Sequence, residues 1–382
     1  MLFLVRNVWR QTEALVHLDR LQHNIRLLKA KLSPGVQMMA TVKADGYGHG
    51  AVEVSKAVLS AGANQLGVAT VEEAVVLRQS GIEAPILVYG ALPEQAANAV
   101  VDYDIMVTVA GAKDIQILAD AANSHHRPVR VHLKLDTGMG RLGVRSIEEM
   151  LIVLSHISDA SSIELEGMFT HLSSADQMHL ADGRVYTEMQ RRRFIEWLDA
   201  AKQAGYHVPI AHMANSAAIL WGSEYHFDMV RPGIAMYGYH PALAWEQGIH
   251  LQPVLELRST ITRIARMQAG EAVSYGRTYV TDHEEWIATV AVGYADGIPR
   301  ALANRAYVEV SGAVVPMVGT VCMDQLMINV TGIDAKVGDP VTIYSKRIES
   351  KASIQRHADL LDTIPYELLC RISSRVPRHY IL

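Results

Sequence analysis

Up to about Gly238, short apolar runs rich in Val, Ile and Met alternate with segments of helical period. This alternation is typical of βα units, in which helices connect parallel strands and pack over them. Eight runs have the length and composition of strands, which favours an α/β fold with a (β/α)8 barrel of the TIM type; an open doubly wound sheet is the alternative. The predicted strands span Gln37–Lys43, Gln65–Ala69, Pro85–Tyr89, Ile105–Thr108, Val129–Asp136, Glu164–Thr170, Pro209–His212 and Phe227–Val230.

The character of the sequence changes from about Pro253 onward. The apolar runs there are β-type and are separated by Gly, Asp and Pro, so we expect a C-terminal, predominantly β domain. We place the barrel domain at residues 1–245 and the β domain at residues 246–382, and residues 1–15 could join the latter. The β-type runs are Leu255–Met267, Trp286–Val292, Tyr307–Val310, Val314–Val318, Leu326–Val330 and Val341–Tyr344, and helical stretches follow at Ile354–Leu361 and from Pro365 toward Arg375.

The length of the chain also favours more than one domain. It has 382 residues, whereas single hydrophobic cores stop growing at about 250 to 300 residues. Hydrophobic residues make up 49% and charged residues 20%, a composition typical of globular rather than disordered proteins. The net charge is −5 and basic residues are scattered, so we do not expect a nucleic-acid partner.

Cysteine content and hydropathy indicate in which cellular compartment the protein resides. The two cysteines, Cys322 and Cys370, are too few for a disulfide framework or a cysteine-built zinc site, so we expect no metal and a reducing cytoplasm. The apolar run Met1–Val5 is interrupted by Arg6 and is too short for a signal peptide. No apolar stretch approaches the ~18 residues that a membrane helix needs, so we expect no membrane association.

The first predicted strand ends in a lysine. Active sites of (β/α)8 barrels form at the C-terminal ends of the strands, so polar residues at those ends are the first functional candidates. Lys43 ends the run and is followed by the loop Asp45–Gly50, whose three glycines permit tight backbone turns. On position alone, a solvated lysine before a turn is the simpler interpretation.

Further polar residues follow other predicted strands. His171 comes after the sixth strand, Asn215 and Ser216 after the seventh, and Arg231 after the eighth. Each alone is compatible with an ordinary surface or structural role. Together with Lys43 they place a lysine, a histidine, an arginine and a hydroxyl on one rim of the barrel, which favours a functional site.

The fifth predicted strand, Val129–Asp136, alternates strictly between apolar and polar residues. Its apolar side would pack on the outer helices, and its polar side would face the barrel interior with Arg130, His132, Lys134 and Asp136. A buried ammonium is costly unless it is paired or neutral, and Arg141 would add to the cost if it also turned inward. Pairing with Asp136, a lowered pKa of Lys134 or its conversion to an anionic carbamate could each compensate. A plain ion pair of Lys134 with Asp136 or with a glutamate elsewhere in the barrel explains the pattern equally well.

Two long motifs resemble those of the alanine racemase family. Val42–Gly50 resembles its cofactor-lysine motif, and Lys134–Gly143 is similar to its second signature. One departure is Asp45-Gly46, where many members carry Asn-Ala, and the segment before Leu18 matches loosely. Further matches follow in the family's order at Thr170-His171, Asn215-Ser216, Arg231–Ile234, Ser274–Gly276, Gly293–Gly297, Cys322–Asp324 and Pro365–Glu367.

The resemblance implies that the protein binds pyridoxal 5'-phosphate as a Schiff base on Lys43. It also implies that Arg231 faces the pyridine nitrogen, to which a permanently charged guanidinium donates a hydrogen bond without releasing its proton. The ring then withdraws electrons less strongly, which favours racemisation over transamination. The implied cofactor-binding residues are Arg141, His171 and Asn215, together with the phosphate-binding residues Tyr47, Ser216, Gly233, Ile234 and Tyr366.

The resemblance further implies that alanine is racemised by two bases. Lys43 would serve one face of the substrate, and Tyr275, in the β domain, would serve the other. A tyrosine with a pKa of about 10 needs about 4 kcal/mol of phenolate stabilisation to act as a base near pH 7. His171, coupled to Arg231, could supply part of it.

Three more residues receive roles from the resemblance. Arg141 would contact the phenolic oxygen of the cofactor and be oriented by a carbamylated Lys134, and Arg141 and Met323 would contact the substrate. Met323 and Asp324 resemble the family's substrate-carboxylate region, whose backbone would receive the amino acid. Because Tyr275 lies in the β domain, the family arrangement completes each site with that domain of a second copy, in a head-to-tail homodimer. The D-alanine formed or consumed would belong to bacterial cell-wall peptidoglycan metabolism, and serine stays open as a second substrate.

Two other functions are alternatives. A pyridoxal-phosphate-dependent decarboxylase could share this architecture, but its substrate-binding signatures are not found, and Tyr275 with Arg231 favours proton transfer. A non-enzymatic carrier of pyridoxal phosphate, built on a lone barrel, would have no use for a β domain that carries Tyr275.

Overall fold

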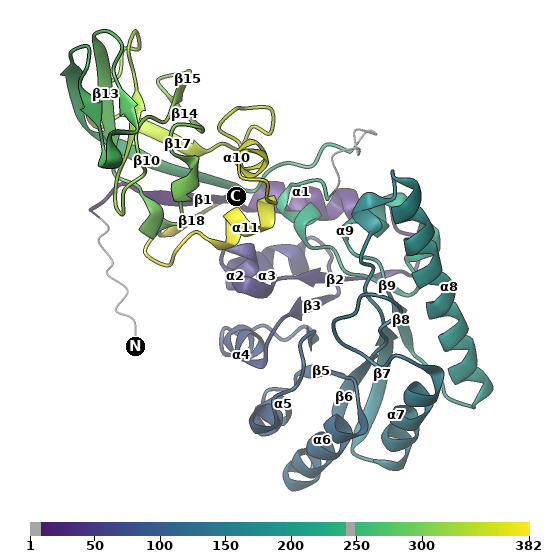
Figure 1. Ribbon diagram of the computed structural model, residues 1–382. Helices are drawn as coiled ribbons and strands as arrows, with labels where there is room; N and C mark the ends of the chain where they lie inside the picture. The colour runs from purple at the N-terminus through teal and green to yellow at the C-terminus, as the bar shows by residue number, and fades with distance from the viewer. Residues whose placement is uncertain (1–8, 242–248) are drawn as a thin grey trace. The chain divides into compact units, whose positions relative to one another are not determined.

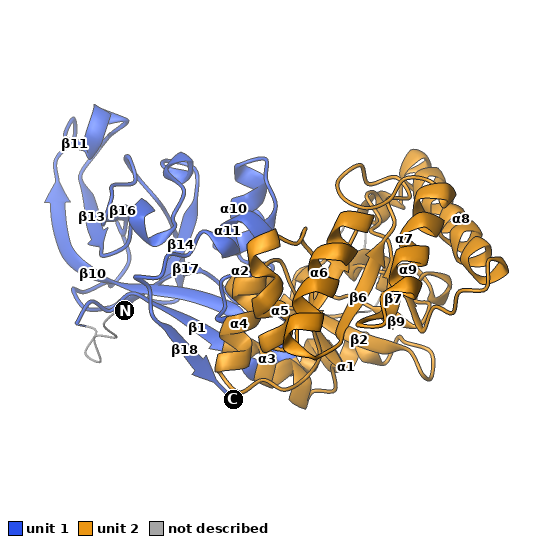
Figure 2. Cartoon of the chain, turned by 90° about the horizontal axis from the view of Figure 1, so that it is seen from below, with its two compact units in different colours: residues 1–21, 47–50, 252–382 blue, residues 22–46, 51–251 orange. Residues whose placement is uncertain are grey.

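The computed structural model describes residues 9–241 and 249–382 (Figure 1). They form two compact units (Figure 2). The first, which we call the β unit, comprises the described residues up to Leu21, residues 47–50 and residues 252–382. The second, the barrel unit, comprises residues 22–46 and the described part of residues 51–251. The apolar run Met1–Val5 and the predicted domain boundary at residues 245 and 246 lie outside the described residues.

The barrel unit contains a closed barrel of parallel strands in the order β2 to β9. Strand β2 pairs with β3 through Met39 and Gln65, and β9 closes the barrel on β2 through Met229 and Gln37. The predicted (β/α)8 barrel is therefore confirmed, with every strand near its expected position. The strands are β2 (Gln37–Thr41), β3 (Gln65–Val68), β4 (Ile86–Val88), β5 (Met106–Val109), β6 (Val129–Lys134), β7 (Ile163–Phe169), β8 (Ile210–His212) and β9 (Met229–Val230).

Part of the barrel core is a cluster of large apolar side chains contributed by several of its strands. The cluster consists of the buried residues Met39, Leu87, Met106, Ile210 and Met229, with Tyr89 packed against it. Such a filled core leaves the strand ends as the places where polar side chains can gather.

Helices lie outside the barrel strands, as α4 to α8 show in Figure 1. Side chains cap several of their N-termini and so decide where they begin. The Thr70 hydroxyl accepts the N–H of Glu73 ahead of α4, and the Ser146 hydroxyl accepts the N–H of Glu149 ahead of α7. The helices that precede or follow the barrel strands are α1 (Leu18–Lys29), α2 (Lys43–Tyr47), α3 (Ala51–Ser60), α4 (Val71–Gln79), α5 (Ala97–Asp102), α6 (Ala112–His125), α7 (Ile147–Asp159), α8 (Ala181–Gln203) and α9 (Ser216–Trp221).

The β unit is built on a mixed sheet in the order β15-β14-β17-β10-β1-β18, and β13 joins it through β10 and carries β16. The predicted, predominantly β region is therefore confirmed. Strand β10 is the longest and pairs with three neighbours, β1, β13 and β17. The elements that correspond to predicted ones are β10 (Leu255–Met267), β13 (Glu285–Val290), β14 (Tyr307–Val310), β15 (Ala313–Pro316), β16 (Leu326–Asn329), β17 (Pro340–Tyr344), α10 (Ile354–Leu360) and α11 (Pro365–Cys370).

Four strands of the β unit were not expected from the sequence. Strand β1 (Glu13–His17) pairs antiparallel with β10 and parallel with β18 (Arg378–Ile381). Strands β11 (Ala272–Val273) and β12 (Tyr279–Val280) form a short hairpin. The first two have partners far away in sequence, and the last two are too short to show a period. None of the described helices combines the length and apolarity needed to span a bilayer.

Candidate active site

Lys43 follows β2 and begins a turn with left-handed backbone geometry. The φ angles of Ala44 and Asp45 are both 52°, a conformation that is unfavourable for residues with a Cβ. Hydrogen bonds hold the turn: Glu73 accepts the N–H of Ala44 over 2.7 Å, and Asp45 accepts the N–H of Ala51 over 2.8 Å. Strain that is held in this way is common at functional sites.

Arg231 follows β9 and is 5% exposed. Its guanidinium donates over 2.6 Å to Nδ1 of His212, over 2.7 Å to the carbonyl of Thr170 and over 3.2 Å to the carbonyl of Met213. Burial lowers the pKa of Arg231 to about 10, so it stays charged at neutral pH. Nε–H and one Nη1–H have no acceptor among the described residues and can donate to a pyridine nitrogen.

His212, at the end of β8, is part of a buried aromatic cluster. Its ring stacks on Phe169 with centroids 4.8 Å apart, and its Nε2 lies 2.9 Å from Nδ1 of His132 on β6. Burial, followed by the charge of Arg231, lowers the pKa of His212 well below its usual range and that of His132 to about 3. Both rings are therefore neutral near pH 7. The sequence indicated the inward position of His132 but gave no role to His212.

His171 lies beside Arg231, as expected for residues at neighbouring strand ends. Its Nδ1 is 3.4 Å from Nη2 of Arg231. Removal from solvent, then the charge of Arg231, lowers the pKa of His171 well below its usual range. Arg141, predicted to face the same site, is an exposed residue.

Lys134, at the end of β6, is 4% exposed, and its Nζ has no hydrogen-bond partner among the described residues. It lies 4.3 Å from the centroid of the Phe169 ring. Burial, followed by the charges of Arg231 and Arg141, lowers its pKa well below the usual lysine value. The predicted inward position of Lys134 is thus consistent with its burial, and this environment favours the neutral form of its amine.

Two charged residues close to Lys134 in the sequence, Arg130 and Asp136, differ from the sequence-based expectation. Asp136 does not form an ion pair with Lys134 within the described residues; its Oδ1 accepts the N–H groups of Gly138 and Gly140 over 3.1 and 2.9 Å. The expected inward position of Arg130 is also wrong in part: its side chain is 26% exposed and lies 3.3 Å from Asp104. Arg130 is the second residue of β6, near the end of the strand that lies away from Lys134.

Ser216 and its neighbours form a polar cradle in the barrel unit. The Ser216 hydroxyl accepts the N–H groups of Gly233 and Ala235 over 2.8 and 3.2 Å. Because both lone pairs are used, its hydrogen remains available to an external acceptor such as a phosphate oxygen. Asn215 caps α9 by accepting the N–H of Ala218 over 3.1 Å, and Ile234 begins the 3-10 turn Ile234–Tyr237.

Two tyrosines predicted to bind a phosphate lie together in the β unit. The rings of Tyr47 and Tyr366 have centroids 5.8 Å apart. Tyr47 is 6% exposed and belongs to the short segment 47–50 of the β unit. Tyr366 lies in the first turn of α11.

Tyr275 lies in the turn between β11 and β12 and is 71% exposed. Ser274 before it has a φ of 66°, and its hydroxyl donates over 2.7 Å to the carbonyl of Thr320. The Thr320 hydroxyl in turn donates over 2.8 Å to the carbonyl of Tyr275. These two bonds hold the strained turn and keep the phenol accessible. Met323, three residues beyond Thr320, is 53% exposed.

These residues fit pyridoxal phosphate. The barrel unit offers a lysine in a held turn, a charged arginine with free donors for a ring nitrogen, and a serine hydroxyl with a free hydrogen for a phosphate. Among the described residues, no group of three His, Cys, Asp or Glu side chains could hold a metal ion.

Comparisons with known proteins show the family of the chain. The family model of the alanine racemase N-terminal domain matches residues 16–241, and that of the C-terminal domain matches residues 254–380. Alanine racemase 1 of Clostridium acetobutylicum is 38% identical over 99% of this chain and 96% of its own length. The alanine racemase of Nostoc sp. is 41% identical over 95% of this chain and 94% of its own length.

A solved structure shows the same fold. The alanine racemase of Bacillus anthracis, solved with bound L-Ala-P, superposes with a TM-score of 0.92 at 37% identity, over 98% of this chain and 96% of its own. The barrel and the β region, matched along nearly their whole length, define an isomerase. The chain belongs to the alanine racemase family, whose activity is the interconversion of L- and D-alanine.

Proposed function

We propose that this chain racemises alanine by two-base proton transfer, with Lys43 and Tyr275 as the bases. The observation that carries the proposal is the environment of Arg231, whose hydrogen bonds in the described residues go to histidines and carbonyl groups. Pyridoxal phosphate, when bound, supplies a ring that withdraws electrons from the substrate and acidifies its Cα–H. Arg231 would donate to the ring nitrogen but keep its proton, which favours rapid return of a proton to Cα.

Lys43 and Tyr275 would act on opposite faces of the substrate. In one direction Lys43 takes the Cα proton and the Tyr275 phenol gives its own proton to the other face; in the other direction the roles reverse. His171, beside the Arg231 charge, would support the phenolate form of Tyr275. The exposed position of Tyr275 in a held turn suits a residue that must reach a substrate.

The phosphate of the cofactor would be held by hydroxyl and backbone N–H groups. We assign its phosphate to Tyr47, Ser216, Tyr366 and the backbone of Gly233 and Ile234, because these supply hydroxyl and N–H donors. Asn215 would orient this cradle through its cap of α9. Covalent attachment at Lys43 follows from its place at the rim of the barrel.

We assign a carbamate to Lys134. Its buried amine has no hydrogen-bond partner among the described residues and a lowered pKa, which increases the fraction of uncharged, nucleophilic amine. The nitrogen lone pair would attack carbon dioxide, and one proton would leave to solvent, giving an anion. This anion would orient Arg141, which with Met323 would contact the substrate.

The protein would act as a homodimer in the cytoplasm. The exposed Tyr275 would complete the site of a second copy in a homodimer, with residues 1–245 as the cofactor domain and residues 246–382 as the domain of the second base. A content of only two cysteines, Cys322 and Cys370, suits a reducing cytoplasm. D-alanine would serve bacterial cell-wall peptidoglycan.

The test is the fate of L-alanine in deuterium oxide. With two bases, early D-alanine should carry deuterium on Cα while unreacted L-alanine keeps its protium. Retention of protium in the product would point to a single base that carries the proton across. Release of carbon dioxide would favour a decarboxylase, and absence of any product a carrier.

A further inference from the structure

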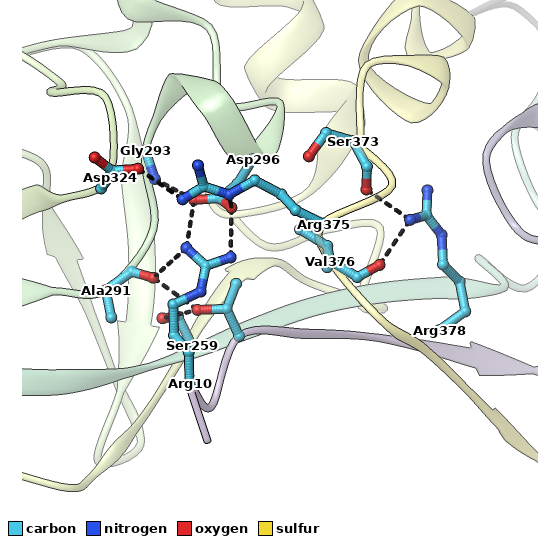
Figure 3. A network of polar contacts seen from close by, with 11 residues as sticks. Arg10, Ser259, Ala291, Gly293, Asp296, Asp324, Ser373, Arg375, Val376 and Arg378 are labelled. Atoms are coloured by element: carbon cyan, nitrogen blue, oxygen red, sulfur yellow. Dashed lines mark hydrogen bonds and ion pairs between the residues drawn. The ribbon is translucent and has the colours of Figure 1, made fainter. Parts of the chain in front are cut away.

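Asp296 is a carboxylate with no solvent exposure that binds two arginines of the β unit (Figure 3). Arg10 donates from Nη2 to Oδ1 over 2.5 Å and from Nη1 to Oδ2 over 3.0 Å. Nε of Arg375 lies 2.8 Å from Oδ1, and the N–H of Gly293 donates to Oδ2 over 2.9 Å. A buried charge is tolerated when it is paired and hydrogen-bonded in this way, and loss of one partner is costly.

The carboxylate holds a tight loop, residues 293–297, between two other segments. A Cβ on Gly293 would lie 2.4 Å from the carbonyl oxygens of both Cys322 and Met323. Gly297 has a φ of +110°, and a Cβ on it would lie 2.4 Å from the carbonyl oxygen of Arg371. The loop therefore has little freedom to shift without moving its neighbours.

The loop orients two peptide units next to it. The N–H of Tyr294 donates to the carbonyl of Cys322, and that of Ala295 to the carbonyl of Met323, both over 3.0 Å. A trans peptide unit is planar, with its C=O and N–H pointing in opposite directions. The N–H groups of Met323 and Asp324 must therefore point away from the loop, and neither has a partner among the described residues.

Arg375 adds a direct link to the same segment. Its Nη2 donates over 2.7 Å to Asp324, so one guanidinium connects the buried carboxylate to the residue after Met323. The other end of the segment is linked to the turn of Tyr275 through Thr320. The segment 320–324 is thus held from both sides.

The family resemblance already assigns the backbone of Met323 and Asp324 to the substrate carboxylate; we propose that Asp296, Arg10 and Arg375 are the residues that position these two N–H donors. The inference rests on the proposed function, in which Met323 contacts the substrate. If the cluster is loosened, the peptide units can rotate and the two donors lose their alignment. Binding of a carboxylate then weakens equally before and during the reaction, which raises KM and leaves kcat nearly unchanged.

The test compares Arg375→Gln with a matched control. Arg347→Gln removes another arginine of the β unit, one that is paired with Glu309. The two arginine side chains have similar exposure, 57% for Arg347 and 41% for Arg375. In the holoenzyme, Arg375→Gln should raise the KM for L-alanine and the inhibition constant of propionate in parallel, by about 5- to 30-fold, with kcat within about threefold. Arg375→Lys, which keeps the charge, should restore part of the loss. The control should change neither constant.

A second readout separates this inference from the proposed function. Amide hydrogen exchange at Tyr294 and Ala295 should be faster in Arg375→Gln than in wild type and unchanged in Arg347→Gln. If wild type does not racemise L-alanine, the proposed function fails, while the exchange data still report on the cluster. If wild type is active and Arg375→Gln has an unchanged KM and propionate constant, the positioning role is rejected. Should Arg375→Gln not fold, the same comparisons are made with Arg10→Gln, which removes the other guanidinium that binds Asp296.

Discussion

The guanidinium of Arg231 donates over 2.6 Å to Nδ1 of His212, and this contact determines where the proton of a buried histidine lies. A guanidinium only donates, so Nδ1 accepts and the proton of neutral His212 is on Nε2. Nε2 then donates over 2.9 Å to Nδ1 of His132, which places the His132 proton on its own Nε2. Two neutral histidines therefore form a directed chain that ends at Arg231.

This chain predicts tautomers that nitrogen-15 NMR can observe directly. His212 and His132 should both show a protonated Nε2 and an unprotonated Nδ1, with no change between pH 6 and 8, because burial lowers both pKa values. His132→Gln keeps an acceptor for His212, whereas His132→Leu leaves a buried donor without one and should cost about 1 to 3 kcal/mol more stability. A charged His212, or one protonated on Nδ1, would contradict the assignment.

The same burial predicts how stability depends on pH. A histidine whose pKa is lowered on folding binds fewer protons in the folded than in the unfolded state, so stability is lost as pH falls below about 6.5. For His132 the loss continues down to its pKa of about 3. Between pH 6.5 and 5 it amounts to about 2 kcal/mol. In denaturant unfolding, the loss of stability between pH 6.5 and 5 should be smaller in His132→Gln than in wild type, by about 2 kcal/mol. His207→Gln, at an exposed position, should show the same loss as wild type.

The barrel strands could be predicted because each is a short buried run between helical segments. Every predicted barrel strand is present, and Lys43, His171, Ser216 and Arg231 lie just beyond strand ends. Strand β1 could not be found in this way, since its partners on β10 lie more than 200 residues away and only tertiary pairing defines it. Contacts between side chains were even harder to predict from the sequence. Asp296 was part of a matched motif, but Arg10 is separated from it by 286 residues, and no local pattern links the two.

The attachment of the cofactor is open to a chemical test. Purified holoenzyme should be yellow, and reduction with borohydride should fix the cofactor on the peptide that contains Lys43. Lys134 provides an internal control, because it is also a lysine at a barrel strand end but is buried. If the cofactor is found on another lysine, the proposed attachment at Lys43 is rejected.

The carbamate on Lys134 predicts both a signal and a rescue. Carbon-13 bicarbonate should give a carbamate resonance that is absent in Lys134→Ala. This variant should lose activity, about 10- to 100-fold for loss of an orienting residue, and added acetate or another short carboxylate should restore part of it by occupying the space of the missing anion. Full activity of Lys134→Ala without any additive would show that Arg141 needs no such partner.

The last prediction concerns the sharing of sites between two copies of the chain. Lys43 lies in the barrel unit and Tyr275 in the β unit, where it is 71% exposed. Lys43→Ala and Tyr275→Phe should each be nearly inactive, because each lacks one of the two bases. If each site combines Lys43 of one copy with Tyr275 of the other, a mixed dimer has one doubly defective site and one intact site.

Mixing the two variants under conditions that exchange subunits should therefore restore activity. With equal amounts and random reassortment, half of the dimers are mixed, so about a quarter of all sites become intact. The recovered rate should reach about a quarter of that of wild type at the same total concentration, and recovery should follow the time course of exchange measured with differently tagged wild-type chains. If each copy used its own tyrosine, every site in the mixture would stay defective. Absence of recovery after demonstrated exchange would reject the shared site and leave the two-base chemistry intact.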